Sequence, residues 1–184
     1  MRSRALMLPE VVLLEPERHE DQRGFFMELW NAERFRAAGF DFPVVQVNLS
    51  RSRKGVIRGL HHQWPEPQGK LVACLQGEIY DVAVDIRRGS PTFGRSVAAM
   101  LTEDNGRMLW IPPGFAHGFA VVSESAQVLY ACSAPYRRAY DRVICYDDPE
   151  FAIDWPVAEP ILSAKDAAAP RLAEVPPEAL PELL

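Results

Sequence analysis

The sequence predicts an all-β protein, either an antiparallel sandwich or a barrel. Many short apolar runs follow one another at near-regular spacing, and connectors rich in Gly, Pro, Asn or Ser separate them. No helical pattern lies between these runs. A parallel α/β sheet is therefore excluded, because the helices that cross between parallel strands would have no room.

Seven runs carry the strand signal. Val45, Val47 and Leu49 share one face of the first run, while polar residues occupy its other face. The even-numbered positions from Tyr80 to Ile86 share one face of the fourth run. In chain order, the predicted strands are Val44–Ser50, Gly55–His61, Lys70–Leu75, Ile79–Ile86, Arg107–Ile111, Gly118–Val122 and Ala126–Cys132.

One short helix is predicted before the first of these strands. Asn31 can cap its N-terminus, Phe35 faces the core, and Gly39 ends it. The segment beyond Trp155-Pro156 is rich in Ala and Pro, so we expect an irregular C-terminal arm with short helical turns from about residue 156. The length of 184 residues predicts a single domain over residues 1–184.

The composition is that of a soluble globular protein, with 48% hydrophobic and 24% charged residues. The net charge of −5 argues against general nucleic-acid binding, but it allows a phosphorylated small molecule held by a few arginines. No apolar run is long enough to span a membrane. Three widely spaced cysteines predict free thiols, buried at Cys74 and Cys132, and a cytoplasmic protein.

Two histidine segments are candidates for chemistry. His61 and His62 are neighbours on a predicted strand, so they point to opposite faces and at most one enters a barrel interior. The alternative is that both are structural. The segment IPPGFAHGF, from Ile111, forms a rigid turn that places His117 at the start of a strand, where it can face a cavity. This segment contains the PxGxxH pattern of the second metal-ligand motif of cupin barrels.

A metal-dependent cupin would also have an HxH motif followed by a glutamate. Here His61 and His62 are adjacent, which makes them a poor chelate, and Lys70 beside His61 would repel a divalent cation. The sequence therefore favours a cupin-like barrel with a metal-free pocket over an iron or zinc site.

Further polar residues lie in the segments around these histidines. Arg23 and Arg58 are candidates for binding a diphosphate, because each precedes a glycine that permits close approach of a ligand to the backbone. Tyr130 is either a core residue or a hydroxyl that faces a cavity, and Asp166 alone is most simply a helix cap. Three other basic residues are expected on a solvated face: Arg51, Arg53 and Lys54.

Taken together, these segments resemble the dTDP-4-dehydrorhamnose 3,5-epimerase family of deoxysugar biosynthesis. The resemblance implies a cupin-type jelly roll with a few short peripheral helices and no metal or organic cofactor. It also implies a homodimer in which strands of one subunit complete the sheet and pocket of the other. The matching stretches, in the family's order, are DQRGFF (from Asp21), QVNLS (from Gln46), GVIRGLHHQ (from Gly55), QGKLV (from Gln68), GEIYDVAVDIRRGSPTFG (from Gly77), IPPGFAHGF (from Ile111), LYACSAPY (from Leu129) and SAKDAAAP (from Ser163).

The resemblance further implies a reaction and a set of site residues. The family inverts C3 and C5 of dTDP-4-dehydro-6-deoxy-D-glucose to give dTDP-4-dehydro-L-rhamnose, by removing protons next to the C4 ketone. His61 resembles the general base and Asp166 the carboxylate that orients it. Tyr130 resembles the general acid, and Lys70 the cation beside the enolate oxygen. The residues that resemble substrate contacts are Arg23, Phe26, Glu28, Gln46, Asn48, Arg58, His117 and Tyr136.

Other functions stay open at this point. His62 stands where the family often has an aromatic residue, and some relatives invert only C3 or only C5. A single-site epimerase of a related nucleotide-linked keto sugar is therefore the main alternative. A metal-dependent cupin enzyme that uses His61 and His117 is a weaker one, followed by a non-catalytic sugar-nucleotide binding module and a purely structural jelly roll.

Overall fold

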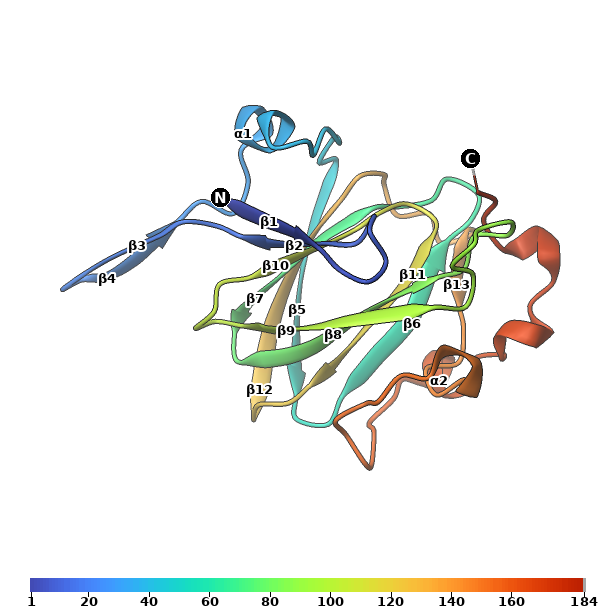
Figure 1. Cartoon of the computed structure of the whole chain (residues 1–184). Helices are drawn as coiled ribbons and strands as arrows, with labels where there is room; N and C mark the ends of the chain where they lie inside the picture. The colour runs from blue at the N-terminus through green and yellow to red at the C-terminus, as the bar shows by residue number, and fades with distance from the viewer. Residues whose placement is uncertain (184) are drawn as a thin grey trace.

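A computed structural model describes residues 1–183 and confirms the antiparallel all-β architecture (Figure 1). Two large sheets face one another across a shared core. In spatial order, the six-stranded sheet contains β1 (Arg2–Ala5), β2 (Val12–Glu15), β10 (Met108–Ile111), β7 (Lys70–Gln76), β12 (Ser125–Cys132) and β5 (Gln46–Arg53). The five-stranded sheet contains β13 (Asp141–Val143), β6 (Ile57–Gln63), β11 (Phe115–Val121), β8 (Glu78–Asp85) and β9 (Ser96–Thr102).

The seven predicted strands are all present, with ends that shift by a few residues. The apolar pattern does not indicate β1, β2, β9 and β13, nor the separate hairpin of β3 (Arg18–Asp21) and β4 (Gly24–Met27). β1 and β3 consist mainly of exposed residues, and β13 has three residues. Strands of this kind form by backbone pairing with a neighbour, so their side chains carry little periodic signal.

Both faces of β8 are buried, whereas an alternating strand usually has one buried and one exposed face. Ile79 and Ala83 belong to the core between the two sheets. Val82 and Val84 lie on the opposite face, in a second buried cluster with Leu172 of the C-terminal arm. The arm, residues 156–183, therefore covers the outside of the five-stranded sheet. Its short helical turns, which follow η1 (Pro149–Phe151), are α2 (Ala164–Ala167), η2 (Leu172–Glu174) and η3 (Pro177–Ala179).

The outside of the six-stranded sheet is covered by α1 (Ala32–Ala37) and the segment around it. The Asn31 side chain caps this helix by accepting hydrogen bonds from the backbone N–H groups of Glu33 and Arg34. Phe35 is buried, and Gly39 follows the helix with φ +92°, so the predicted helix is confirmed. In the described part of the chain, no helix is long and apolar enough to cross a membrane.

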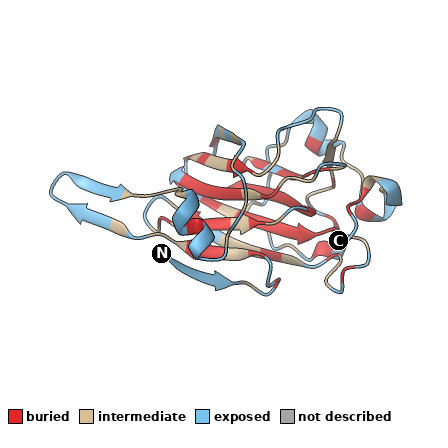
Figure 2. Ribbon diagram, turned by 90° about the horizontal axis from the view of Figure 1, so that it is seen from above, coloured by how far each residue is buried: buried red, intermediate tan, exposed pale blue. Residues whose placement is uncertain are grey.

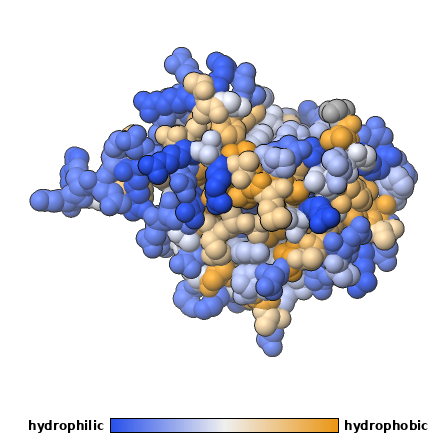
Figure 3. All heavy atoms as spheres, viewed as in Figure 1, coloured by the Kyte–Doolittle hydropathy of each residue, from blue (hydrophilic) through white to orange (hydrophobic). Residues whose placement is uncertain are grey.

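The β3–β4 hairpin projects from the body of the protein (Figure 1), and its strands are exposed (Figure 2). Its visible surface is largely hydrophilic (Figure 3). It nevertheless carries two large exposed aromatic side chains, Phe25 at 53% and Phe26 at 70%. Exposed aromatic residues on a projecting hairpin are typical of a surface that meets another molecule.

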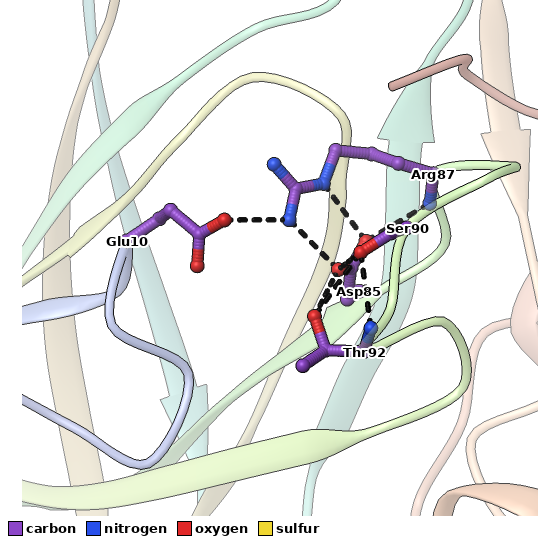
Figure 4. A network of polar contacts seen from close by, with 5 residues as sticks. All are labelled: Glu10, Asp85, Arg87, Ser90 and Thr92. Atoms are coloured by element: carbon purple, nitrogen blue, oxygen red, sulfur yellow. Dashed lines mark hydrogen bonds and ion pairs between the residues drawn. The ribbon is translucent and has the colours of Figure 1, made fainter. Parts of the chain in front are cut away.

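A buried carboxylate closes the connection between β8 and β9. Asp85 is fully buried and accepts hydrogen bonds from the Arg87 guanidinium and from the Ser90 and Thr92 hydroxyls (Figure 4). Arg87 also donates to Glu10, 3.0 Å away, which ties the N-terminal segment to this loop. Burial alone would raise the pKa of Asp85, but these hydrogen bonds outweigh burial and lower its pKa to about 2.

The Asp85→Asn substitution should destabilise the fold by about 2–4 kcal/mol, because it removes the negative charge beside Arg87 and replaces with an NH2 group either the oxygen that binds Arg87 Nε or the oxygen that binds both hydroxyls. The wild-type pKa, below the ordinary value of 3.8, adds about 2 kcal/mol of stability that is present above pH 4 and lost towards pH 2. Urea unfolding from pH 7 to pH 2 measures both effects. Asp104→Asn, at an exposed position, is the control. Equal stability of the two variants would contradict this account.

Candidate active site

A cavity of about 520 Å³ opens at one end of the space between the two sheets and is closed on one side by the C-terminal arm. Strands β5, β7 and β12 of one sheet and β6 of the other contribute to its walls. The cavity brings together eight of the predicted site residues: His61, Asp166, Lys70, Tyr130, Gln46, Asn48, Arg58 and Tyr136.

The first feature of the cavity is a histidine–carboxylate pair. The Nε2 atom of His61 lies 2.6 Å from an Oδ1 oxygen of Asp166. Asp166 is buried within α2, and the Ser163 hydroxyl accepts from its backbone N–H and so starts that helix. Burial raises the pKa of Asp166, but the hydrogen bond and charge of His61 outweigh burial, and the net pKa is lowered. Asp166 is therefore an ionised partner that fixes the His61 ring.

Lys70 and Tyr130 line the same cavity from the other sheet. Burial lowers the pKa of Lys70, and the charges of Cys132 and Asp141 oppose this shift. Burial raises the pKa of Tyr130, so its phenol keeps its proton at neutral pH. His61 on one sheet thus shares the cavity with a lysine side chain and a neutral phenol from the other.

The polar residues around this centre come from neighbouring positions of β5, β6 and the loop after β12. Gln46 donates to the Oδ1 oxygen of Asn48 at 2.9 Å, and both side chains line the cavity. The Nε atom of Arg58 donates to the Ser52 hydroxyl at 2.9 Å, which holds the guanidinium at the cavity. Tyr136 lies at the rim, half-exposed.

Four predicted site residues do not line the cavity of their own chain, and three of them belong to the segment of the projecting hairpin. Arg23 and Phe26 are on the projecting hairpin, with Glu28 just beyond it, and none of the three lines the cavity. Arg23 forms an ion pair with Asp21 instead. Within one chain these three residues therefore lie away from the cavity, and their role as substrate contacts stays a prediction.

His117 also differs from its prediction. It is the third residue of β11, not the start of a strand, and it does not line the cavity. Its side chain is buried and lies 2.9 Å from an oxygen of Asp81 in β8. Burial lowers the pKa of His117, with Asp81 opposing the shift. Among residues 1–183, no three His, Cys, Asp or Glu side chains gather as metal ligands would.

The glycine after Arg58 has a different physical reason from the one expected. A Cβ atom at Gly59 would lie 2.6 Å from the Cα atom of Gly118, so the two strands β6 and β11 touch there. Gly59 also has φ +134°, a backbone conformation that favours glycine. Gly59 thus permits close packing of two strands behind the site, and the approach of a ligand does not explain it.

The sequence profile of the dTDP-4-dehydrorhamnose 3,5-epimerase family matches residues 5–174. The chain belongs to this family. An epimerase of this name from Pseudomonas aeruginosa is 48% identical over 176 residues, which cover 95% of this chain and 97% of the relative. A crystal structure of a dTDP-6-deoxy-D-glucose-3,5-epimerase from Legionella pneumophila, in complex with dTDP-4-keto-L-rhamnose, has a TM-score of 0.97 and 47% identity, and covers 100% of this chain and 98% of that chain.

Single-site enzymes share the same architecture. A 3'-monoepimerase from Streptomyces bikiniensis, in complex with dTDP-quinovose, has a TM-score of 0.90 and 36% identity, and covers 97% of this chain and 92% of that chain. The predicted family, the cupin jelly roll and the isomerase class are confirmed by these relatives. Fold similarity alone does not separate double from single epimerisation, so that distinction depends on the residues of the cavity.

The epimerase cavity contains further polar residues that the sequence motifs alone do not single out. Gln63, Gln68 and Lys165 lie inside stretches that carry the family resemblance, beside the residues with predicted roles. Asp141 lies on the short strand β13 and has no sequence signal of its own. Lys165 and Asp141 form an ion pair of 2.5 Å at the rim.

His62, where this epimerase departs from the family pattern, lies under the C-terminal arm. Its side chain is 4% exposed, and its Nε2 donates to the Ala179 carbonyl at 3.3 Å. Its Nδ1 atom is buried without a hydrogen-bond partner in the structure. His62 also borders the cavity, and burial lowers its pKa from 6.5 to about 4.

The buried imidazole of His62 should make the epimerase acid-sensitive. The unfolded chain takes up a proton at His62 below pH 6.5, whereas the folded chain resists it until about pH 4. Stability is therefore complete above pH 6.5 and should fall by about 3 kcal/mol as the pH drops to 4. Urea unfolding of wild type and His62→Phe at pH 7 and pH 4.5 measures this. The variant should show a smaller loss between the two pH values, and parallel losses would contradict the assignment.

Proposed function

We propose that this chain inverts both C3 and C5 of dTDP-4-dehydro-6-deoxy-D-glucose, giving dTDP-4-dehydro-L-rhamnose for deoxysugar biosynthesis. The observation that carries the proposal is the facing arrangement of the cavity. The His61–Asp166 pair projects from one side, and Lys70 and Tyr130 come from the opposite sheet. Inversion requires a proton to leave one face of a carbon and another to arrive on the opposite face, and this arrangement supplies both groups.

In the proposed reaction, each carbon loses one proton to His61 and gains one proton from Tyr130. His61 takes the proton from a carbon next to the C4 ketone, and the electron pair moves to the C4 oxygen as an enolate. The Lys70 ammonium stabilises that oxygen. Tyr130 then donates its phenolic proton to the opposite face of the carbon, and the two side chains return to their starting states by exchange with solvent. The reaction transfers protons only, so it needs no oxidant or reductant.

We also propose that the site is completed by a second copy of this chain. The hairpin that carries Arg23 and Phe26 projects away from its own cavity. The edge strand β5 exposes Val47 and Leu49, at 57% and 61%, next to the cavity. An exposed apolar edge strand favours pairing with another chain. A partner hairpin would bring an arginine and an aromatic ring to a nucleoside diphosphate.

We further propose a cytoplasmic location, because the three cysteines are free thiols.

Subunit complementation should test this homodimer. His61→Asn and Arg23→Ala, each tested alone, should be nearly inactive at low substrate concentration. Co-expressed with different tags, they form mixed dimers in which one site has both an intact His61 and an intact partner hairpin. About a quarter of wild-type activity should return. If each hairpin serves its own chain, or if the protein is monomeric by light scattering, no activity returns.

Proton NMR of the substrate in D₂O, with chelator-treated protein, tests the reaction. Loss of both the C3 and the C5 proton signals is the expected result. Loss of one signal alone would establish the single-site alternative, for which the Streptomyces bikiniensis 3'-monoepimerase is the precedent. Activity that disappears with the chelator and returns with added metal would favour a metal-dependent enzyme. Affinity for dTDP without exchange would mean a binding module.

A further inference from the structure

Three glutamine side chains hold one loop of the cavity rim, residues 133–138, between β12 and β13. Gln68 donates to the carbonyl of Ala134 at 2.7 Å. Gln46 accepts from the backbone N–H of Tyr136 at 2.8 Å. The third, Gln63, bonds the loop on both sides of Tyr136. These amides come from three separate strands or their ends, so the loop's backbone is tied to the barrel rather than to itself.

Gln63 makes the largest contribution to this arrangement. It is 4% exposed and uses both ends of its amide. Its Nε2 donates to the carbonyls of Glu66 at 2.6 Å and Pro135 at 3.2 Å. Its Oε1 accepts from the backbone N–H of Arg137 at 2.7 Å. The catalytic proposal gives Gln63 no role, yet this buried amide joins two backbone groups of the loop to the connection between β6 and β7 and so defines the position of the loop.

The loop presents Tyr136 to the cavity in a defined orientation. The backbone N–H of Tyr136 is held by Gln46, and its hydroxyl donates to Asp141 at 3.0 Å. Asp141 in turn accepts from Lys165 at 2.5 Å. The ring is therefore fixed at both ends, while half of its surface stays exposed at the rim. Such a ring can stack on a planar base without further ordering.

We propose that Gln63 is a positioning residue that preforms this tyrosine wall for the nucleobase of the substrate. The inference rests on the proposed function, because it assigns the Tyr136 end of the cavity to the base. Replacing Gln63 by Leu removes its hydrogen bonds to the carbonyl of Pro135 and the N–H of Arg137, so the loop backbone loses this anchor and is free to shift. The ligand must then order the loop again on binding. His61, Lys70 and Tyr130 are held by the backbone pairing of β6, β7 and β12, in which the Gln63 side chain takes no part, so saturated turnover should be kept.

Calorimetric binding of two probes, dTDP and inorganic pyrophosphate, tests the proposal. In Gln63→Leu, the Kd for dTDP should rise about tenfold, while the Kd for pyrophosphate and kcat stay within a factor of about three. Combining Gln63→Leu with Tyr136→Ala should add little to the loss in Tyr136→Ala alone, because both act through the same ring. Gln76→Leu removes an exposed amide outside the cavity and is the control for the amide loss.

The outcomes distinguish a failure of the proposed function from a failure of the positioning role of Gln63. If wild type binds no dTDP, the proposed function fails. If wild type binds dTDP but Gln63→Leu binds it equally well, or loses dTDP and pyrophosphate affinity together, the positioning role is wrong. Additive losses in the double variant would also overturn it. If Gln63→Leu does not fold, Gln68→Leu replaces it, because this variant loses one loop hydrogen bond and should show a smaller rise in the same Kd.

Discussion

His61→Asn should lower kcat by on the order of 10³-fold and leave folding and dTDP affinity close to wild type. Asparagine retains a hydrogen-bond donor for Asp166 but has no group that can accept a proton from carbon. The side chain of His61 is about one-third exposed to the cavity, so its loss opens no buried space. Exchange of the substrate's C3 and C5 protons with D₂O, measured together with thermal unfolding, checks both parts.

Asp166→Asn is the matched variant of His61→Asn, because it keeps the shape of the residue that contacts His61 and removes its negative charge. The Asp166 pKa is already lowered below 3.8, so the carboxylate is ionised throughout the neutral range and its protonation should not limit activity above pH 4. The variant should lose about 10²-fold in kcat, since the amide neither selects the correct His61 tautomer nor stabilises the imidazolium. Loss of stability with unchanged kcat would make the pair structural.

The strands that surround the cavity were predictable because their side chains alternate. Strand β5 shows what alternation of side chains predicts and what it does not. Its polar face, with Gln46 and Asn48, lines the cavity, and its apolar face, with Val47 and Leu49, is exposed. Alternation separates two faces of a strand, but it does not say which face another chain covers. Exposed apolar residues become informative only when the sheet edge is known.

The pairing of His61 with Asp166 was indicated only by family resemblance. Asp166 lies 105 positions from His61, and no local pattern links a residue of a short helix to one on a strand. Spacing alone left Asp166 as a helix cap, but the cap of α2 is Ser163, and Asp166 lies in the first turn. The His117–Asp81 pair escaped prediction for a related reason. β11 begins three residues earlier than predicted, so His117 lies inside the strand beside Asp81 of β8, and no local pattern links these two residues.

Lys70→Met should reduce kcat by roughly 10²–10³-fold, because the enolate oxygen then forms without a nearby positive charge. Methionine matches the length of the aliphatic stem, so the cavity wall should stay packed. Lys70→Arg keeps the charge and should retain more activity than the Met variant, although the larger guanidinium does not place its donors where the ammonium stood. Wild-type turnover with Lys70→Met would remove the enolate role.

The pH dependence on the alkaline side distinguishes a charge effect from a packing effect at Lys70. Burial lowers the Lys70 pKa below 10.5, so the ammonium is lost at a lower pH than in a free lysine. Burial raises the Tyr130 pKa, so the phenol is still protonated when Lys70 begins to lose its proton. Wild-type kcat should therefore fall below pH 10.5, and the same decline in Lys70→Arg should move to higher pH. If both proteins decline together, another group controls that limb, and the charge at Lys70 does not stabilise the transition state.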